Sequence, residues 1–225
     1  MPNPTIASAA PSWRWPFVIA TVAALAIVGA LQPDLRILHY LCKPLATLLI
    51  ALRVWRAREA DPRYRGAVLS GLIASTAGDV FLMLPVDAFV AGLASFLVAH
   101  LAYLYALTRR RGLLPLRWPW AAYALLAGGV LALLWPGLPG GLRPAVVVYV
   151  MALAAMAAQA GSVALARRSR STSAAAWGGA SFVVSDALLA IDRFHTPLPA
   201  AAALVLMSYW TAQYLIGRSV WQHRA

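Results

Sequence analysis

Apolar stretches of about twenty residues, separated by short polar or Pro- and Gly-containing segments, occupy almost the whole chain. An α-helix rises 1.5 Å per residue, so about 20 residues cross the ~30 Å hydrocarbon core of a bilayer. The pattern predicts membrane-spanning helices at 16–31, 37–53, 66–84, 88–107, 118–135, 144–165, 174–191 and 199–217. We therefore expect an all-α integral membrane bundle of about eight helices over residues 16–220, preceded by a cytoplasmic segment over residues 1–15.

Composition supports a membrane protein. The 225 residues are 62% hydrophobic and only 12% charged, with a mean hydropathy of +0.72. A soluble domain of this length would need more charged surface. The net charge of +12 could suggest nucleic acid, but 18 of the 19 basic residues are arginines that lie between the apolar stretches. Arginines in such positions set the orientation of a membrane protein and contact anionic headgroups. Membrane lipids and not nucleic acid are therefore the expected partners.

The basic residues also predict an orientation. Fifteen of them fall on one side of the predicted spans, and only Arg36, Arg143 and Arg193 fall on the other. The positive-inside rule places the richer side, with both termini, in the cytoplasm. The Ala- and Arg-rich composition points to a bacterium, so we expect a multi-pass protein of the inner membrane. One alternative concerns the first stretch, because Arg14 followed by apolar residues ending in Val28-Gly29-Ala30 also fits a cleaved signal peptide.

Four ionisable residues, Lys43, Asp79, His100 and Asp186, lie inside these apolar stretches. A charge at the bilayer centre costs roughly 2.5–3.5 kcal/mol, so each is a candidate for function. Counted along the helices, Lys43 and both acids fall at one depth in the outer half of the bilayer, which predicts a shared polar cavity. Neighbouring buried acids cannot both ionise cheaply, so we expect one carboxyl to stay protonated and the other to be ionised beside Lys43.

Other interpretations stay open for several of these residues. The Lys43 ammonium and a carboxylate often form a structural pair between helices, and His100 would serve equally well as a hydrogen-bonded packing residue. Tyr209 and Gln213 are one helical turn apart, and they either line the cavity or bond across helices. The four histidines lie far apart, there is no HExxH or GxSxG motif, and Cys42 is the only cysteine. No metal site, serine nucleophile or internal disulfide is therefore expected.

Several ordered elements resemble the YhhN-type lysoplasmalogenase family. The resemblance extends from about residue 36 to residue 217. One departure is Asp192, which stands where an uncharged polar residue is expected and adds a charge at the cavity mouth. The matching elements are Lys43-Pro44, Gly78–Met83 (GDVFLM), Phe89–Tyr103 (FVAGLASFLVAHLAY), Phe182–Ala190 (FVVSDALLA), Asp192-Arg193-Phe194, and Tyr209 with Gln213.

The resemblance implies a hydrolase that cleaves the vinyl ether bond of lysoplasmalogens, releasing a fatty aldehyde and a glycerophosphoethanolamine or glycerophosphocholine. Vinyl ethers hydrolyse by acid catalysis, which agrees with two buried acids and requires no cofactor. We predict Asp79 and Asp186 as the acid–base pair, with the division between them undecided, and a lysophospholipid substrate entering from the bilayer. The other expected substrate-binding residues are polar side chains from four spans: Lys43, His100, Tyr103, Ser185, Tyr209 and Gln213.

Two other functions fit the same residues. In a proton-coupled transporter or lipid-binding membrane protein, the Asp79, Lys43 and Asp186 group would couple protons or hold a headgroup. A hydrolase of a different lysolipid would use the same acids. The sequence leaves headgroup preference, chain preference and oligomeric state open.

Overall fold

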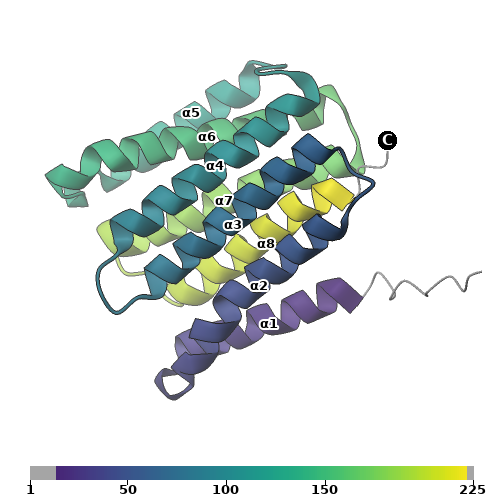
Figure 1. Cartoon of the computed structure of the whole chain (residues 1–225). Helices are drawn as coiled ribbons and strands as arrows, with labels where there is room; N and C mark the ends of the chain where they lie inside the picture. Colours follow the sequence, from purple (N-terminus) through teal and green to yellow (C-terminus); the bar gives the residue numbers. More distant parts are fainter. Residues whose placement is uncertain (1–13, 222–225) are drawn as a thin grey trace, which may run out of the picture.

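The computed structural model describes residues 14–221, which fold into eight α-helices joined by short turns (Figure 1). The eight predicted helices are confirmed, and the described residues contain no β-strand. Three short 3-10 helices lie in the turns, at Pro33–Leu35, Trp135–Gly137 and Gly140–Leu142. The α-helices are α1 (Arg14–Leu31), α2 (Arg36–Arg56), α3 (Pro62–Met83), α4 (Phe89–Arg111), α5 (Trp118–Leu134), α6 (Arg143–Ala166), α7 (Arg170–Phe194) and α8 (Ala201–Trp221).

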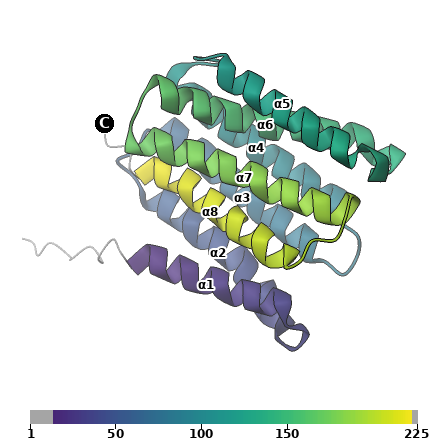
Figure 2. The ribbon, with the colours of Figure 1, turned by 180° about the vertical axis from the view of Figure 1, so that it is seen from behind.

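Seven of the described helices, α1 to α7, are long and apolar enough to cross a membrane. α8 is not among these seven, but it is 21 residues long and packs along α7 within the same bundle (Figure 2). The expected cytoplasmic segment over residues 1–15 lies almost entirely outside the described residues. Its location, like the side of the membrane on which each end of the bundle lies, stays a prediction.

Some helices begin before the apolar stretches that predicted them, because polar side chains cap them. The Asp61 carboxylate accepts a hydrogen bond from the Tyr64 amide at 2.7 Å, and Pro62 occupies the first turn of α3. Ser169 and Thr172 form a capping box at the start of α7. Such caps satisfy amide groups that have no partner inside the helix. Each helix therefore extends beyond the part that is apolar enough to lie in hydrocarbon.

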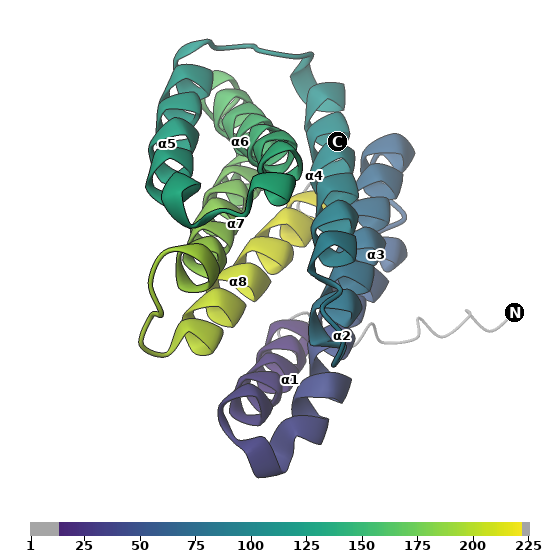
Figure 3. The ribbon, with the colours of Figure 1, turned by 90° about the vertical axis from the view of Figure 1, so that its left-hand side faces the viewer.

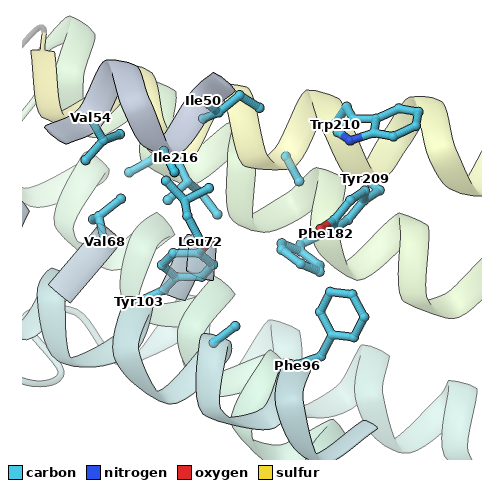
Figure 4. Packing of buried hydrophobic residues seen from close by; sticks show 14 of the residues in the cluster. Ile50, Val54, Val68, Leu72, Phe96, Tyr103, Phe182, Tyr209, Trp210 and Ile216 are labelled. Atoms are coloured by element: carbon cyan, nitrogen blue, oxygen red, sulfur yellow. The ribbon is translucent and has the colours of Figure 1, made fainter. Parts of the chain in front are cut away.

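Aromatic rings fill the centre of the bundle against small residues. The Phe182 ring of α7 lies between Phe96, Tyr103 and Tyr209, with ring centroids 5.6–6.5 Å apart (Figure 4). A Cβ atom added to Gly78 would lie 2.7 Å from the Phe96 ring, so this glycine lets α3 and α4 approach closely. Close approach at small residues is typical of helix packing in membranes.

The turns between helices lie at two opposite ends of the bundle (Figure 1). The α1–α2, α3–α4, α5–α6 and α7–α8 turns lie at one end, together with Arg36, Arg143 and Arg193. The remaining turns lie at the other end, with all the other arginines of the described chain. The two sides inferred from the basic residues are therefore the two ends of the bundle.

Candidate active site

A cavity of about 720 Å³ lies inside the bundle and reaches the end where α1 turns into α2. Most of its wall is apolar, and α5 contributes Leu126 and Val130 while α6 contributes Val150 and Leu153. Its size is within the range of small-molecule sites. Twelve polar side chains interrupt the apolar wall: Arg36, His39, Tyr40, Lys43, Asp79, Tyr123, Tyr149, Ser185, Asp186, Asp192, Arg193 and Tyr209.

Asp79 is surrounded by hydrogen-bond donors. Its Oδ2 atom accepts hydrogen bonds from the Tyr209 hydroxyl at 2.7 Å and the Thr47 hydroxyl at 3.1 Å. Its Oδ1 atom lies 3.7 Å from Nζ of Lys43, the only lysine of the chain. Asp79 is 1% exposed. Two hydroxyl donors and an ammonium stabilise the charged form of a buried carboxylate, so this arrangement suits an ionised Asp79.

Asp186 has a different environment on α7. Its Oδ2 atom accepts a hydrogen bond from the Tyr149 hydroxyl and lies 3.4 Å from Nε2 of His100. The Tyr149 oxygen in turn lies 3.0 Å from the same His100 nitrogen. Because Tyr149 donates to the carboxylate, His100 donates to Tyr149, which places the histidine proton on Nε2. The Oδ1 atom of Asp186 has no hydrogen-bond partner among the described residues, and the side chain is 15% exposed.

The two acids therefore line one cavity but belong to separate hydrogen-bond groups. Neither carboxylate bonds to the other within the described chain, and each has its own tyrosine, Tyr209 for Asp79 and Tyr149 for Asp186. The pairing of Lys43 with one acid is confirmed, and the acid is Asp79. One carboxylate with a full set of donors and another with a free oxygen can divide the work of an acid and a charged partner.

Three of the predicted substrate-binding residues lie behind the wall of the cavity. The Tyr103 hydroxyl donates to Oε1 of Gln213 at 2.7 Å, and neither residue lines the cavity. His100 is 0% exposed, is absent from the cavity wall, and lies 3.0 Å from the Tyr149 hydroxyl and 3.4 Å from the Asp186 carboxylate, both of which line it. Lys43, Ser185 and Tyr209 do line it, although the Ser185 hydroxyl is bonded to the Val205 carbonyl at 3.1 Å.

Tyr149 and Thr47 were not among the residues predicted from the sequence. Tyr149 is a hydroxyl within the otherwise apolar start of α6, and Thr47 follows Lys43 by one helical turn on α2. A search for hydroxyl groups at the depth of the acids would have found both residues.

The mouth of the cavity has its own polar contacts. Arg193 lies 3.2 Å from the Asp87 carboxylate and stacks over the Phe89 ring, with 4.1 Å between the guanidinium and the ring centroid. Asp192 accepts a hydrogen bond from the Leu198 amide at 2.8 Å. This bond stabilises the α7–α8 turn and gives the charged residue at this position a structural role. No group of three His, Cys, Asp or Glu side chains within residues 14–221 is arranged to hold a metal ion.

A helical bundle with one buried and one partly buried carboxylate around a largely apolar cavity defines a polytopic membrane protein with a candidate acid–base site. Comparison with known proteins identifies its relatives. The chain belongs to the YhhN family, whose model matches residues 38–220.

Curated relatives of this chain are lysoplasmalogenases. It is 36% identical over 185 residues to lysoplasmalogenase TMEM86B of Sus scrofa, covering 80% of this chain and 74% of the relative. It is 31% identical over 209 residues to human TMEM86B, covering 91% and 84%. It is 34% identical over 187 residues to the lysoplasmalogenase of Mycobacterium bovis, covering 79% and 70%. No solved structure matches the chain.

Proposed function

We propose that this protein is a membrane hydrolase that cleaves the vinyl ether bond of lysoplasmalogens. The observation that carries this proposal is the placement of Asp79 and Asp186 in one cavity with different hydrogen-bond partners. The names of the relatives and the family match support the same substrate class. The apolar wall formed by α5 and α6 suits the alkenyl chain of a lysolipid that enters from the bilayer.

Asp186 is the better placed acid, because its Oδ1 atom has no partner in the described chain and its side chain lines the cavity. In the first step, Asp186 delivers a proton to the β-carbon of the vinyl ether. The electrons of the double bond form the new C–H bond, and the ether oxygen shares its lone pair with the α-carbon. The product of this step is an oxocarbenium ion.

Asp79 is the charged partner. Its carboxylate, held by Lys43, Tyr209 and Thr47, stabilises the positive charge that develops on the substrate and positions the attacking water. Water adds to the α-carbon and returns a proton to the Asp186 carboxylate. The hemiacetal then breaks its bond to the glycerol oxygen, which gains a proton as the hemiacetal hydroxyl loses one. The products are a fatty aldehyde and the glycerophospho alcohol, with no net proton consumed.

The test uses the protein purified into lipid nanodiscs with an alkenyl-glycerophosphoethanolamine, and it measures fatty aldehyde by mass spectrometry. Asp186→Asn keeps the shape of the side chain but cannot deliver a proton, so we expect the rate to fall by about a hundredfold or more. Asp79→Asn should also lower the rate, through loss of charge stabilisation. The matched control is Glu59→Gln, an acid-to-amide change at an exposed side chain in the α2–α3 turn, outside the cavity wall.

Wild-type rates in both Asn variants of the cavity would refute the assignment of the acids. Absence of aldehyde from wild-type protein, together with lipid or proton flux in proteoliposomes, would favour the transporter instead. An analogue with a saturated ether bond, which cannot be protonated at carbon, should give no aldehyde.

For location, we propose the inner membrane of a bacterium, with the arginine-rich end in the cytoplasm. The distribution of arginines and a mycobacterial relative support this placement. Cys42 is buried, so single cysteines introduced at Arg58 and Gly140, which lie in turns at opposite ends, report the orientation. A thiol reagent that cannot cross membranes should label Gly140→Cys and not Arg58→Cys in intact spheroplasts. The reverse pattern would contradict the orientation.

A further inference from the structure

Arg36 is the cation of the cavity that has no acidic partner. It is exposed, it is the first residue of α2, and it lines the cavity. The wall contains one lysine and one further arginine, and each has an acidic partner. Lys43 is paired with Asp79 at 3.7 Å, and Arg193 is paired with Asp87 at 3.2 Å. No carboxylate within residues 14–221 lies at ion-pair distance from Arg36. Its guanidinium is therefore the group available to bind an anion that enters the cavity.

The position of Arg36 along α2 matches the distance between the reacting bond and the phosphate of a lysolipid. Arg36 and Lys43 are two helical turns apart on one face, which is about 10 Å along the axis. Lys43 marks the level of Asp79, where the vinyl ether would react. The ether oxygen and the phosphorus are separated by five bonds of about 1.5 Å, or about 6 Å when extended. A long arginine side chain spans the remaining distance.

The α1–α2 turn holds Arg36 in place. Nδ1 of His39, one turn after Arg36, donates to the Ala26 carbonyl of α1 at 3.0 Å. A Cβ atom added to Gly29 would lie 2.8 Å from the Leu35 carbonyl, so the end of α1 packs directly against the start of α2. Because both contacts fix the start of α2 against α1, Arg36 projects from a rigid support. A preorganised donor loses less freedom when it binds an anion.

The apolar part of the cavity lies on the other side of the bundle. α5 and α1 are at opposite sides of the helical layers (Figure 3), and α5 lines the cavity with Leu126, Ala127 and Val130. A lysolipid bound across this cavity would place its hydrocarbon chain against α5 and α6. Its charged end would then lie toward the α1–α2 turn.

We propose that Arg36 binds the phosphate group of the lysolipid and thereby sets both the orientation of the substrate and the preference for a phosphorylated headgroup. This inference rests on the proposed lysolipid substrate but not on hydrolysis. Guanidinium groups form paired, charge-assisted hydrogen bonds with phosphate oxygens, which an uncharged side chain cannot replace.

The experiment measures binding of ligands that cannot be hydrolysed, so it does not depend on catalysis. An alkyl-glycerophosphoethanolamine with a saturated ether bond is compared with the matching alkylglycerol, which lacks phosphate, for protein in nanodiscs of neutral lipid. The wild-type protein should bind the phosphorylated ligand at least tenfold more tightly. Arg36→Gln should remove most of this preference and leave alkylglycerol binding unchanged, whereas Arg36→Lys should retain part of it.

Arg143→Gln is the matched control, because Arg143 lies at the same end of the bundle but outside the cavity wall. It should keep the wild-type preference. The proposal would be overturned if Arg36→Gln lost affinity for both ligands equally, or if its preference for the phosphorylated ligand were unchanged. An arginine that only contacts surrounding lipid would not discriminate between the two ligands. If inorganic phosphate displaced the bound ligand while the protein showed no preference between the two lipids, the site would be assigned to a free anion. That result would overturn the lysolipid assignment.

Discussion

Replacing Tyr149 with phenylalanine removes the hydroxyl that bridges His100 and Asp186, whose facing Nε2 and Oδ2 atoms lie 3.4 Å apart. The Tyr149 hydroxyl donates to the Asp186 carboxylate and lies 3.0 Å from Nε2 of His100. In the variant, Asp186 loses the donor that orients it. The His100 Nε2–H also loses its closest acceptor inside the protein, and its Nδ1 already has no partner among the described residues.

The structure sets the expected size of both effects. A buried donor that is left without its acceptor costs about 1–3 kcal/mol, so the variant should be about 2 kcal/mol less stable. For a chain of this length that lowers the melting temperature by about 4–8 °C. The effect on rate should be larger, because a displacement of about 1 Å in a catalytic group costs about a hundredfold. We expect kcat to fall by that factor while KM changes little, since the substitution removes the hydroxyl that orients Asp186 but leaves the aromatic ring in the cavity wall.

The assay is aldehyde release over a range of lysoplasmalogen concentrations, with melting temperature measured on the same preparations. Tyr64→Phe is the control. Its hydroxyl is 2.6 Å from the Ser219 hydroxyl at the arginine-rich end, and Tyr64 is 2% exposed compared with 7% for Tyr149. It should lose stability and keep kcat. A wild-type kcat in Tyr149→Phe, or equal loss of kcat in both variants, would refute the assigned role.

The remaining predictions concern stability. Lys43→Met leaves the Asp79 carboxylate buried without its cation and should cost about 3 kcal/mol, whereas adding Asp79→Asn should recover part of that loss; additive melting shifts would contradict the coupling. Gly178→Ala places a Cβ atom 2.9 Å from the α8 backbone and should lower the melting temperature, while Gly128→Ala on α5 meets no atom within 4 Å and should not lower it. Gln159→Ala removes a 2.6 Å bond to the Gly112 carbonyl and should make the α4–α5 turn more sensitive to protease; an unchanged cleavage rate would contradict this.

The helices were predictable because the bilayer imposes a length on every apolar segment. Hydropathy marks only the part of a helix that suits hydrocarbon, however. α3 begins at Pro62 and not at residue 66, and α7 begins at Arg170 and not at residue 174. The added turns contain polar and basic residues, which hydropathy does not assign to a membrane span. Their caps, at Asp61 and Ser169, are readable in the sequence once helix ends are sought separately from membrane boundaries.

The sequence predicts how deep each site residue lies along its helix, but not the direction in which its side chain points around the helix axis. Counting residues along each span placed Lys43 and Asp79 at one level, and the structure pairs them. The same counting cannot say which face of a helix points toward the cavity. Tyr103 and Gln213 therefore bond to each other behind the wall, although their sequence pattern predicts contact with substrate. Tyr149 was missed for the opposite reason, because its rotation toward Asp186 depends on how α6 packs against α4 and α7.

The concentration of arginine at one end of the bundle has a consequence for how the protein responds to alkaline conditions. All basic residues of the chain except Lys43 and the histidines are arginines. Guanidinium groups keep their proton well above physiological pH, whereas lysine amines begin to lose theirs. Attraction between this end and anionic lipid should therefore persist as the medium becomes basic. Amine-directed coupling reagents, by contrast, would find no lysine on the surface of the bundle, because the one lysine is buried beside Asp79.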